Sequence, residues 1–346
     1  MQKLLILDGI GGVPLGREIY EAFCEDDVNA SYCDLAQLKK IYFYGLRSAL
    51  AKLINRAERL DDFFHLPKLD LKRFINLLEK ERPTHILVVG FVYKLIAPSV
   101  LKRLKQDYNF SLYLYDTDSC NLYAKRREFI FFLDQELPVY DKIFSFSKVT
   151  TQFFERTRNL NAIHLPFGAK PIPPQYSDKK HNVLFVGSGD LRRIFLLENI
   201  RDEVVVYGNR WERNFPLISQ GLQSHIVDQS TWGGDLYRLL RASKIVLNIT
   251  RTHFYGAETG VNLRIFEALA SGAFLLTDYC EEIAELFEIG VEIETFNNAS
   301  ELKQKVNYYL ANPELREAIA RHGYEKFMSH HTWKERVTRL REHIAI

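Results

Sequence analysis

The sequence has few cysteines, no long apolar run and almost no net charge, and each shortage excludes a class of protein. Its four cysteines, Cys24, Cys33, Cys120 and Cys280, are widely scattered and form no CxxC pair. This pattern argues against a zinc site and against a disulfide framework. We therefore predict no metal site, and a protein that works in a reducing cytoplasm.

Charge and hydropathy exclude further partners. Lys and Arg number 46 against 44 Asp and Glu, a net charge of +2, so nothing in the charge balance indicates nucleic-acid binding. No uninterrupted apolar stretch approaches the roughly 18 to 20 residues that cross a bilayer. The apolar run within Met1 to Asp8 is too short for a signal peptide and predicts a first β-strand.

Short apolar runs alternate with helical patterns in both halves of the chain. At 346 residues, 47% hydrophobic and 26% charged, the sequence predicts a globular protein of two domains. Continuous apolar strands separated by helices predict an α/β fold, with two Rossmann-like, doubly wound parallel sheets covered on both faces. The runs are 4–7, 85–90, 111–115 and 142–146, then 182–187, 204–207, 244–248 and 273–277.

The domain boundaries follow from a proline-rich break. Four prolines fall within residues 166–175, and such a segment reads as a stiff linker. We predict an N-terminal domain over 1–168, a linker over 169–181, a C-terminal domain over 182–330, and a last helix over 331–346 that returns to the first domain. The carboxyl edges of the two sheets are then expected to face each other across a ligand-binding cleft.

The segment from Gly256 to Asp278 joins a polar, glycine-bearing loop, an acidic helix face and a buried strand. A helix starting near Asn262 would direct its positive end at an anion, and Glu267 would lie about one and a half turns into it. This pattern indicates a phosphate-and-ribose site. Alternatively, it is an ordinary parallel α/β unit in which Ser271 and Gly272 only end the helix.

Several C-terminal segments together resemble a glycosyltransferase family. They are 183–187 with Arg192 and Arg193, Val206 to Trp211, Ala242 to Thr250, Gly260 to Gly272, and Phe274 to Asp278. In combination they resemble GT-B glycosyltransferases, and more narrowly the CgeB-like (spore maturation protein B-like) group related to the family 4 glycosyltransferases. The N-terminal half resembles them only in layout, through 115–118, 140–144 and 164–168.

The resemblance implies sugar transfer from a nucleotide-diphosphate sugar of the UDP, GDP or dTDP type to an acceptor hydroxyl, without a metal ion or other cofactor. The acceptor would be a glycan, a lipid-linked molecule or a protein, in the synthesis of cell-surface polysaccharides or glycoconjugates. Two alternatives share the architecture: a sugar-nucleotide epimerase, and a non-catalytic sugar- or nucleotide-binding surface protein.

Family 4 enzymes carry two glutamates separated by seven residues, the first touching the donor sugar and the second the ribose. Here Glu258 and Glu267 are separated by eight. The resemblance therefore assigns Glu267 to the ribose and leaves the role of Glu258 open.

The departing diphosphate needs its negative charge stabilised by N–H groups and cations. The candidate donor-binding residues lie at strand ends, where ligands of α/β sheets bind; for the arginines the alternative is a solvated surface charge. They are Gly187, Arg192, Arg193, Gly208, Asn209, Arg251, Gly260, Val261, Asn262, Leu263, Arg264 and Glu267. His253 is a candidate donor contact or a structural histidine. Trp211 covers the base, closes the interdomain cleft or packs in the core.

In the first domain, Asp8, Gly11 and Gly12 form a loop that we expect on the acceptor side. Asp116 and Asp118 follow a strand, and either is a candidate general base. Alternatively, they form a turn and a helix cap.

The stretch from Lys39 to Arg56 mixes cationic and aromatic residues at helical spacing. It predicts a surface helix with one buried face. The alternative is peripheral docking on the inner face of an anionic cell membrane.

Overall fold

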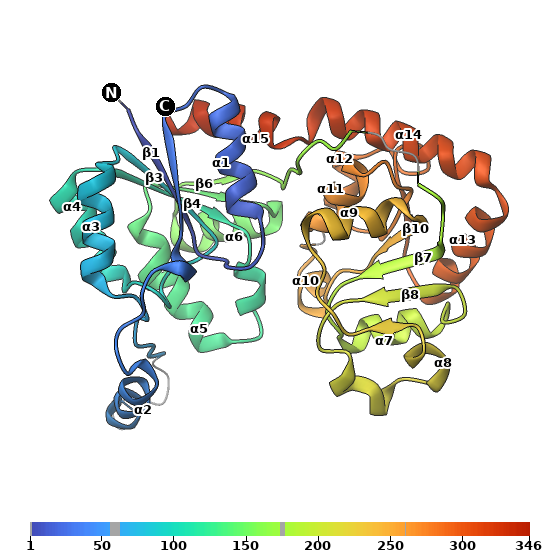
Figure 1. The fold of residues 1–346 in the computed structure, drawn as a ribbon, viewed down its shortest axis with the longest axis horizontal. Coiled ribbons are helices and arrows are strands. Elements are labelled where there is room, and N and C mark those ends of the chain that lie inside the picture. Colours follow the sequence, from blue (N-terminus) through green and yellow to red (C-terminus); the bar gives the residue numbers. More distant parts are fainter. Residues whose placement is uncertain (1, 56–62, 174–176, 260) are drawn as a thin grey trace. The chain divides into compact units, whose positions relative to one another are not determined.

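The computed structural model describes residues 2–55, 63–173, 177–259 and 261–346, and strands alternate with helices along the chain (Figure 1). Two compact units are present, one formed by Met1–Pro166 with Val337–Ile346 and the other by Phe167–Arg336. Residues 174–176 of the predicted linker lie outside the described residues.

Unit 1 is built around a six-stranded parallel sheet of order β2-β1-β3-β4-β5-β6. Its elements are β1 (Leu4–Asp8), α1 (Leu15–Glu25), β2 (Ala30–Asp34), α2 (Tyr44–Asn55), α3 (Leu71–Glu81), β3 (His85–Val89), α4 (Pro98–Tyr108), β4 (Ser111–Asp116), α5 (Arg126–Phe131), β5 (Lys142–Ser145), α6 (Lys148–Arg158) and β6 (Ala162–His164). In register, Asp8 at the end of β1 lies opposite Val89 at the end of β3.

Both faces of this sheet are covered, because alternate residues of each strand point to opposite sides. On β1, Leu5 and Leu7 belong to the same buried cluster as Phe74 of α3. Leu4 and Ile6, which point the other way, are also fully buried. The continuous apolar strands of the sequence are thus explained by burial on two sides.

Unit 2 repeats the plan with a six-stranded parallel sheet of order β12-β11-β10-β7-β8-β9. Its elements are β7 (His181–Val186), α7 (Leu191–Glu198), β8 (Val204–Tyr207), α8 (Gln220–Gln223), β9 (Ile226–Val227), α9 (Gly233–Arg241), β10 (Ser243–Asn248), α10 (Thr252–Gly256), α11 (Leu263–Ala270), β11 (Leu275–Asp278), α12 (Glu281–Leu286), β12 (Glu294–Phe296), α13 (Ala299–Ala311) and α14 (Pro313–His330). The predicted α/β class with two doubly wound parallel sheets is confirmed.

The last helix, α15 (Trp333–Ile344), begins in unit 2 and ends in unit 1. In unit 1 its carboxyl end accepts hydrogen bonds from Tyr113 Oη to the Ile344 carbonyl (3.4 Å) and from Lys142 Nζ to the His343 carbonyl (2.7 Å). In unit 2, Arg336 Nε donates to the carbonyl of Phe167 (3.0 Å). The chain therefore enters and leaves unit 2 at neighbouring points.

All four cysteines are free thiols. Among the helices of the described ranges, none has the length and apolar character that a membrane span requires.

Candidate functional site

The unit 2 sheet has a topological switch point between β7 and β10. These two strands are neighbours, yet β8 continues the sheet on one side and β11 continues it on the other. The loops that follow β7 and β10 therefore leave in opposite directions at the carboxyl edge, which is where ligands of open α/β sheets bind. Most of the predicted donor residues lie on these two loops and on the helices that follow them.

Helix α11 begins where the sequence predicted, because Asn262 caps it. Asn262 Oδ1 accepts the backbone N–H of Arg264 (3.0 Å), and Asn262 Nδ2 donates to Asn248 Oδ1 (3.0 Å). Asn248 Nδ2 in turn donates to Thr277 Oγ1 (2.9 Å). This chain of side chains fixes the positive end of α11 at the carboxyl ends of β10 and β11.

A buried ion pair lies on the first turns of α11. Arg264 Nη1 is 2.7 Å from Glu267 Oε2, and the two side chains are 11% and 7% exposed. Burial raises the pKa of Glu267, while the charge of Arg264 opposes that rise. Arg264 Nε is buried without a hydrogen-bond partner. A buried, unpaired donor is costly, which makes this guanidinium a candidate for contact with an anionic ligand.

Arg192, on the first turn of α7, reaches across the switch point. Its Nη1 donates to Asp278 Oδ2 (2.6 Å) and to the carbonyl of Thr250 (2.9 Å). Its guanidinium carbon lies 3.6 Å from the ring centroid of Tyr255, a cation–π contact. Because Asp278 also accepts the N–H and hydroxyl of Thr250, Arg192 holds the ends of β10 and β11 beside α10.

Arg193 is engaged differently from its neighbour. It is 7% exposed, and its Nε and Nη2 both donate to the carbonyl of Ile249, while Nη1 donates to the carbonyl of Ser188. Burial lowers the pKa of Arg193 to about 10. Arg193, which the sequence predicted as a donor contact, therefore links the loops after β7 and β10 through hydrogen bonds.

The loops after β7 and β8 touch at two glycines. A Cβ on Gly208, where φ is +153°, would lie 2.0 Å from the carbonyl oxygen of Gly187, so only glycine fits there. Trp211 is fully buried and its Nε1 donates to that same carbonyl (2.8 Å). Trp211 therefore packs in the core, which is the last of its three predicted roles. Asn209 is exposed, and its carbonyl accepts the N–H of Gly189 (3.0 Å).

The segment from Arg251 to Thr259 forms α10 and the turn that ends it. Arg251 is the residue before α10, and His253 on this helix is exposed. Glu258 lies in the following turn, exposed and with a left-handed backbone (φ +57°). It is not on α11, so the eight-residue spacing to Glu267 does not rotate it about that helix. Val261 is buried and Leu263 half-buried, while Gly260 lies outside the described residues.

In unit 1, the predicted acceptor loop is held by Asp8. Its Oδ1 accepts the N–H of Ile10 (3.0 Å) and its Oδ2 accepts the Tyr32 hydroxyl (2.9 Å). Burial raises the pKa of Asp8. Gly11 and Gly12 have positive φ angles of +65° and +78°. The loop follows β1 at the switch point between β1 and β3.

The two candidate general bases, Asp116 and Asp118, differ in solvent exposure. Asp116 is buried, and it accepts the Ser119 hydroxyl (2.6 Å), the Ser145 hydroxyl (3.0 Å) and the Ser119 N–H (3.0 Å). Burial raises the pKa of Asp116. Asp118 is half-buried at the start of a short 3₁₀ turn and accepts Asn121 Nδ2. These bonds agree with the turn-and-cap alternative.

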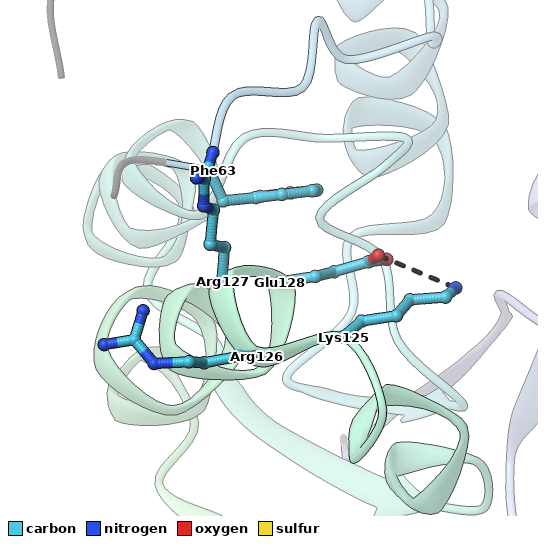
Figure 2. Close-up of a pocket in the computed structure, with 5 residues that line it drawn as sticks. All are labelled: Phe63, Lys125, Arg126, Arg127 and Glu128. Carbon is cyan, nitrogen blue, oxygen red and sulfur yellow. Dashed lines mark ion pairs between the residues drawn. The ribbon is translucent and has the colours of Figure 1, made fainter. Parts of the chain in front are cut away.

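A pocket of 510 Å³ in unit 1 was not predicted from the sequence. It is lined by Phe63 and by the run Lys125, Arg126, Arg127 and Glu128 at the start of α5 (Figure 2). Glu128 pairs with Lys94 (2.5 Å) and Lys125 (3.6 Å). In the sequence, the only sign of this pocket is the cationic run from Lys125 to Arg127, which lies shortly after the predicted turn at Asp116.

Two aspartates that position the candidate residues of unit 2 were also missed. Asp190 caps α7 and accepts the Thr252 hydroxyl of α10 (3.3 Å), while Asp278 anchors Arg192, whose guanidinium stacks on Tyr255. An aspartate directly before a helix after Gly-Ser-Gly is a recognisable N-cap signal. Within the described ranges, no three His, Cys, Asp or Glu side chains are grouped as metal ligands.

Comparison with known proteins supports a glycosyltransferase. Residues 192–342 match the family model described as glycosyl transferase-like. No curated protein sequence matches the chain. The family match covers α7, α10 and α11, and so includes the Arg264–Glu267 pair.

Solved structures with the same fold cover nearly the whole chain. Sucrose-phosphate synthase from Thermosynechococcus elongatus is 11% identical, with 99% of this chain and 98% of that chain covered and a TM-score of 0.66. Anabaena HepE in complex with UDP-glucose is 14% identical, with 100% of both chains covered and a TM-score of 0.64. An α-glucosyltransferase in complex with UDP is 12% identical, with 100% of both covered and a TM-score of 0.67. The chain therefore has the GT-B fold.

Proposed function

We propose that this chain transfers a sugar from a nucleotide-diphosphate sugar to an acceptor hydroxyl, with the donor bound in unit 2 at the switch point between β7 and β10. One observation carries the proposal: the buried Arg264–Glu267 pair on the first turns of α11, 2.7 Å apart, within the segment that matches the glycosyl transferase-like family. Acceptor binding is assigned to unit 1.

The chemistry of the donor fits this end of the sheet. A carboxylate accepts hydrogen bonds from two neighbouring hydroxyls, and the charge of Arg264 opposes the rise that burial causes in the pKa of Glu267. The N-terminus of α11 and the Nε of Arg264 are suited to a diphosphate. Glu267 would hold the ribose while the helix end, Arg264, Arg192 and Arg251 stabilise the charge that develops on the leaving diphosphate.

We further propose that these groups act without a metal ion. Their cationic side chains and N–H groups are the kind that stabilise a departing phosphate. Gly187, Gly208 and Asn209 would shape the nucleotide pocket, and Val261 with Leu263 its floor. Glu258 and His253 are proposed on the sugar side of the donor.

The first donor to test is suggested by two neighbours whose structures hold UDP or UDP-glucose. Isothermal titration of the purified chain with UDP, GDP and dTDP, each alone and as its glucose or mannose conjugate, is expected to give saturable binding for one base. Absence of binding to every nucleotide and conjugate contradicts the proposal.

Two narrower assignments accompany the proposal. The segments at 183–187, 206–211 and 260–272 support membership of the CgeB-like group. Four free thiols support a cytoplasmic reaction, where nucleotide sugars and a glycan, lipid-linked or protein acceptor would meet.

A further inference from the structure

Helix α2 presents an apolar face to solvent. Leu46, Leu50, Leu53 and Ile54 share one side of the helix, at the i, i+4, i+7 and i+8 positions, and all are exposed, Ile54 by 72%. Directly before the helix, Tyr42 is exposed and Phe43 is 81% exposed. A helix of a globular protein normally turns such a stripe to the core, so this one is oriented the opposite way.

The opposite side of α2 faces the protein through Tyr44 and Ser48. Ser48 is buried, and Tyr44 Oη donates to the carbonyl of Leu66 (3.1 Å). Before the helix, Ile41 N donates to the Lys68 carbonyl and Asp70 N to the Lys39 carbonyl, both at 2.9 Å. These bonds attach the helix to unit 1 and fix its orientation.

Exposed positive charges lie beside the apolar face. Between Leu35 and Ala57 the sequence contains no Asp or Glu. Lys39, Lys40, Arg47 and Lys52 are all exposed. Lys39 lies over the ring of Tyr42, with its Nζ 4.2 Å from the ring centroid. Cations beside exposed apolar and aromatic side chains complement the headgroups and acyl boundary of an anionic bilayer.

The positive charge continues toward the pocket of Figure 2. Phe63 stacks on His65 with ring centroids 6.5 Å apart, and the charges of Lys68, Lys94 and Lys52 each lower the pKa of His65 after burial. Phe63 also lines the pocket with Lys125, Arg126 and Arg127 (Figure 2). Cations therefore recur from α2 to the start of α5, where Glu128 pairs with Lys94 and Lys125.

The length of α2 limits how it can meet lipid. Its 12 residues span about 18 Å at 1.5 Å per residue, well short of the roughly 30 Å hydrocarbon core. A helix of this kind lies in the interface and does not cross it.

We propose that α2 docks unit 1 on an anionic lipid bilayer, with Leu46, Leu50, Leu53 and Ile54 in the acyl boundary and the surrounding lysines and arginine against the headgroups. The contact is independent of nucleotide binding. A second copy of this chain is the competing occupant of the face, and the experiment distinguishes the two.

The test is co-sedimentation of the full chain with vesicles of phosphatidylcholine alone and of phosphatidylcholine with 30% phosphatidylglycerol. We expect binding to the anionic vesicles that falls as salt rises. Leu53→Glu/Ile54→Glu is expected to lower the partition coefficient by more than about tenfold, because two inserted side chains become charged. Lys39→Gln/Lys40→Gln is expected to lower it roughly fivefold for each cation removed.

Phe195→Glu/Leu217→Glu is the matched control, since these apolar side chains are 64% and 62% exposed in unit 2. It should bind vesicles as the unchanged chain does. Far-ultraviolet circular dichroism and UDP titration check that each variant is folded, so loss of lipid binding is read separately from the donor site.

Two results overturn the proposal. One is equal binding of the unchanged chain and Leu53→Glu/Ile54→Glu to anionic vesicles. The other is absence of vesicle binding together with a dimer, measured by sedimentation velocity, that Leu53→Glu/Ile54→Glu dissociates; the face would then join two copies of the chain.

Discussion

Arg264 and Glu267 form a 2.7 Å ion pair on one face of α11, one turn apart and almost fully buried. Burial raises the pKa of Glu267 and the charge of Arg264 opposes that rise, so the carboxylate depends on its partner for its charge. A ligand that binds here meets a carboxylate and a guanidinium already oriented toward each other.

Replacement of Glu267 should weaken donor binding. Glu267→Gln keeps the shape of the side chain and removes the charge, so a ribose hydroxyl loses a charge-assisted acceptor. We expect the affinity for the nucleotide that binds to fall by about 1 to 3 kcal/mol, measured by titration calorimetry.

The control for this prediction is Glu281→Gln, an exposed carboxylate at the start of α12. It should leave the affinity unchanged. Equal affinity of a folded Glu267→Gln and the unchanged chain would remove the ribose assignment.

Replacing Arg192 and replacing Arg193 should have different effects on nucleotide affinity and on the free energy of unfolding. Arg193→Met leaves the carbonyls of Ile249 and Ser188 without their donors, and we expect a loss of about 2 to 4 kcal/mol in the free energy of unfolding. Arg192→Ala should lower stability less and nucleotide affinity more, by about tenfold. Urea denaturation and nucleotide titration on both variants measure the two effects.

The reverse outcome is informative. If Arg193→Met keeps its stability and loses nucleotide affinity, Arg193 contacts the ligand directly, as the sequence alone had suggested.

Gly208→Ala should destabilise unit 2 by several kcal/mol. The new Cβ would meet the Gly187 carbonyl oxygen at 2.0 Å, so the two loops must separate and the bond from Trp211 to that carbonyl is strained. Thermal unfolding measures the effect. Gly45→Ala on α2, where an added Cβ meets nothing within 4 Å, is the matched control and should be neutral or stabilising by about 0.5 to 1 kcal/mol. Similar melting temperatures for the two variants would contradict the close approach.

Stability should fall in mild acid because of His331. This side chain is 3% exposed between the rings of Phe266 and Phe287, and burial, followed by the charge of Arg336, lowers its pKa from 6.5 to about 3. Between these values the unfolded chain binds a proton that the folded chain does not. Stability is therefore full above pH 6.5 and lost as pH falls, by about 2 kcal/mol at pH 5 relative to pH 7.5.

His331→Gln cannot titrate and should lack this loss, whatever its stability at pH 7.5. His322→Gln, at an exposed position of α14, should behave as the unchanged chain. Urea denaturation at pH 5.0 and 7.5 gives the difference, and an equal loss in all three proteins would exclude His331 as its source.

The central strands could be predicted from the sequence, because strands buried on both faces are continuous apolar runs. The last helix was also predicted, over 331–346, and it spans Trp333–Ile344. The strands that were missed, β2, β6, β9 and β12, are short or lie toward sheet edges. The five residues of β2 are all only half-buried, so they carry no such run.

The sequence placed the candidate residues at strand ends but did not reveal their contacts. It could not distinguish a guanidinium bound to backbone carbonyls, such as that of Arg193, from one at the ligand-binding edge of the sheet, because that difference depends on tertiary contacts. The same holds for Trp211, which is buried. The exposed stripe of α2 was read as a surface helix with a buried apolar face, and the structure shows the apolar side outward.

The path of the chain through unit 2 has a consequence for its synthesis. All of unit 2 lies between Phe167 and Arg336, whereas unit 1 needs Val337–Ile346 as well as the N-terminal residues. Arg341 binds Asp26, and Tyr113 binds the carbonyl of Ile344. On the ribosome, the half translated first is therefore the half completed last, because it lacks the contacts of Arg341 and Ile344 until α15 has been synthesised.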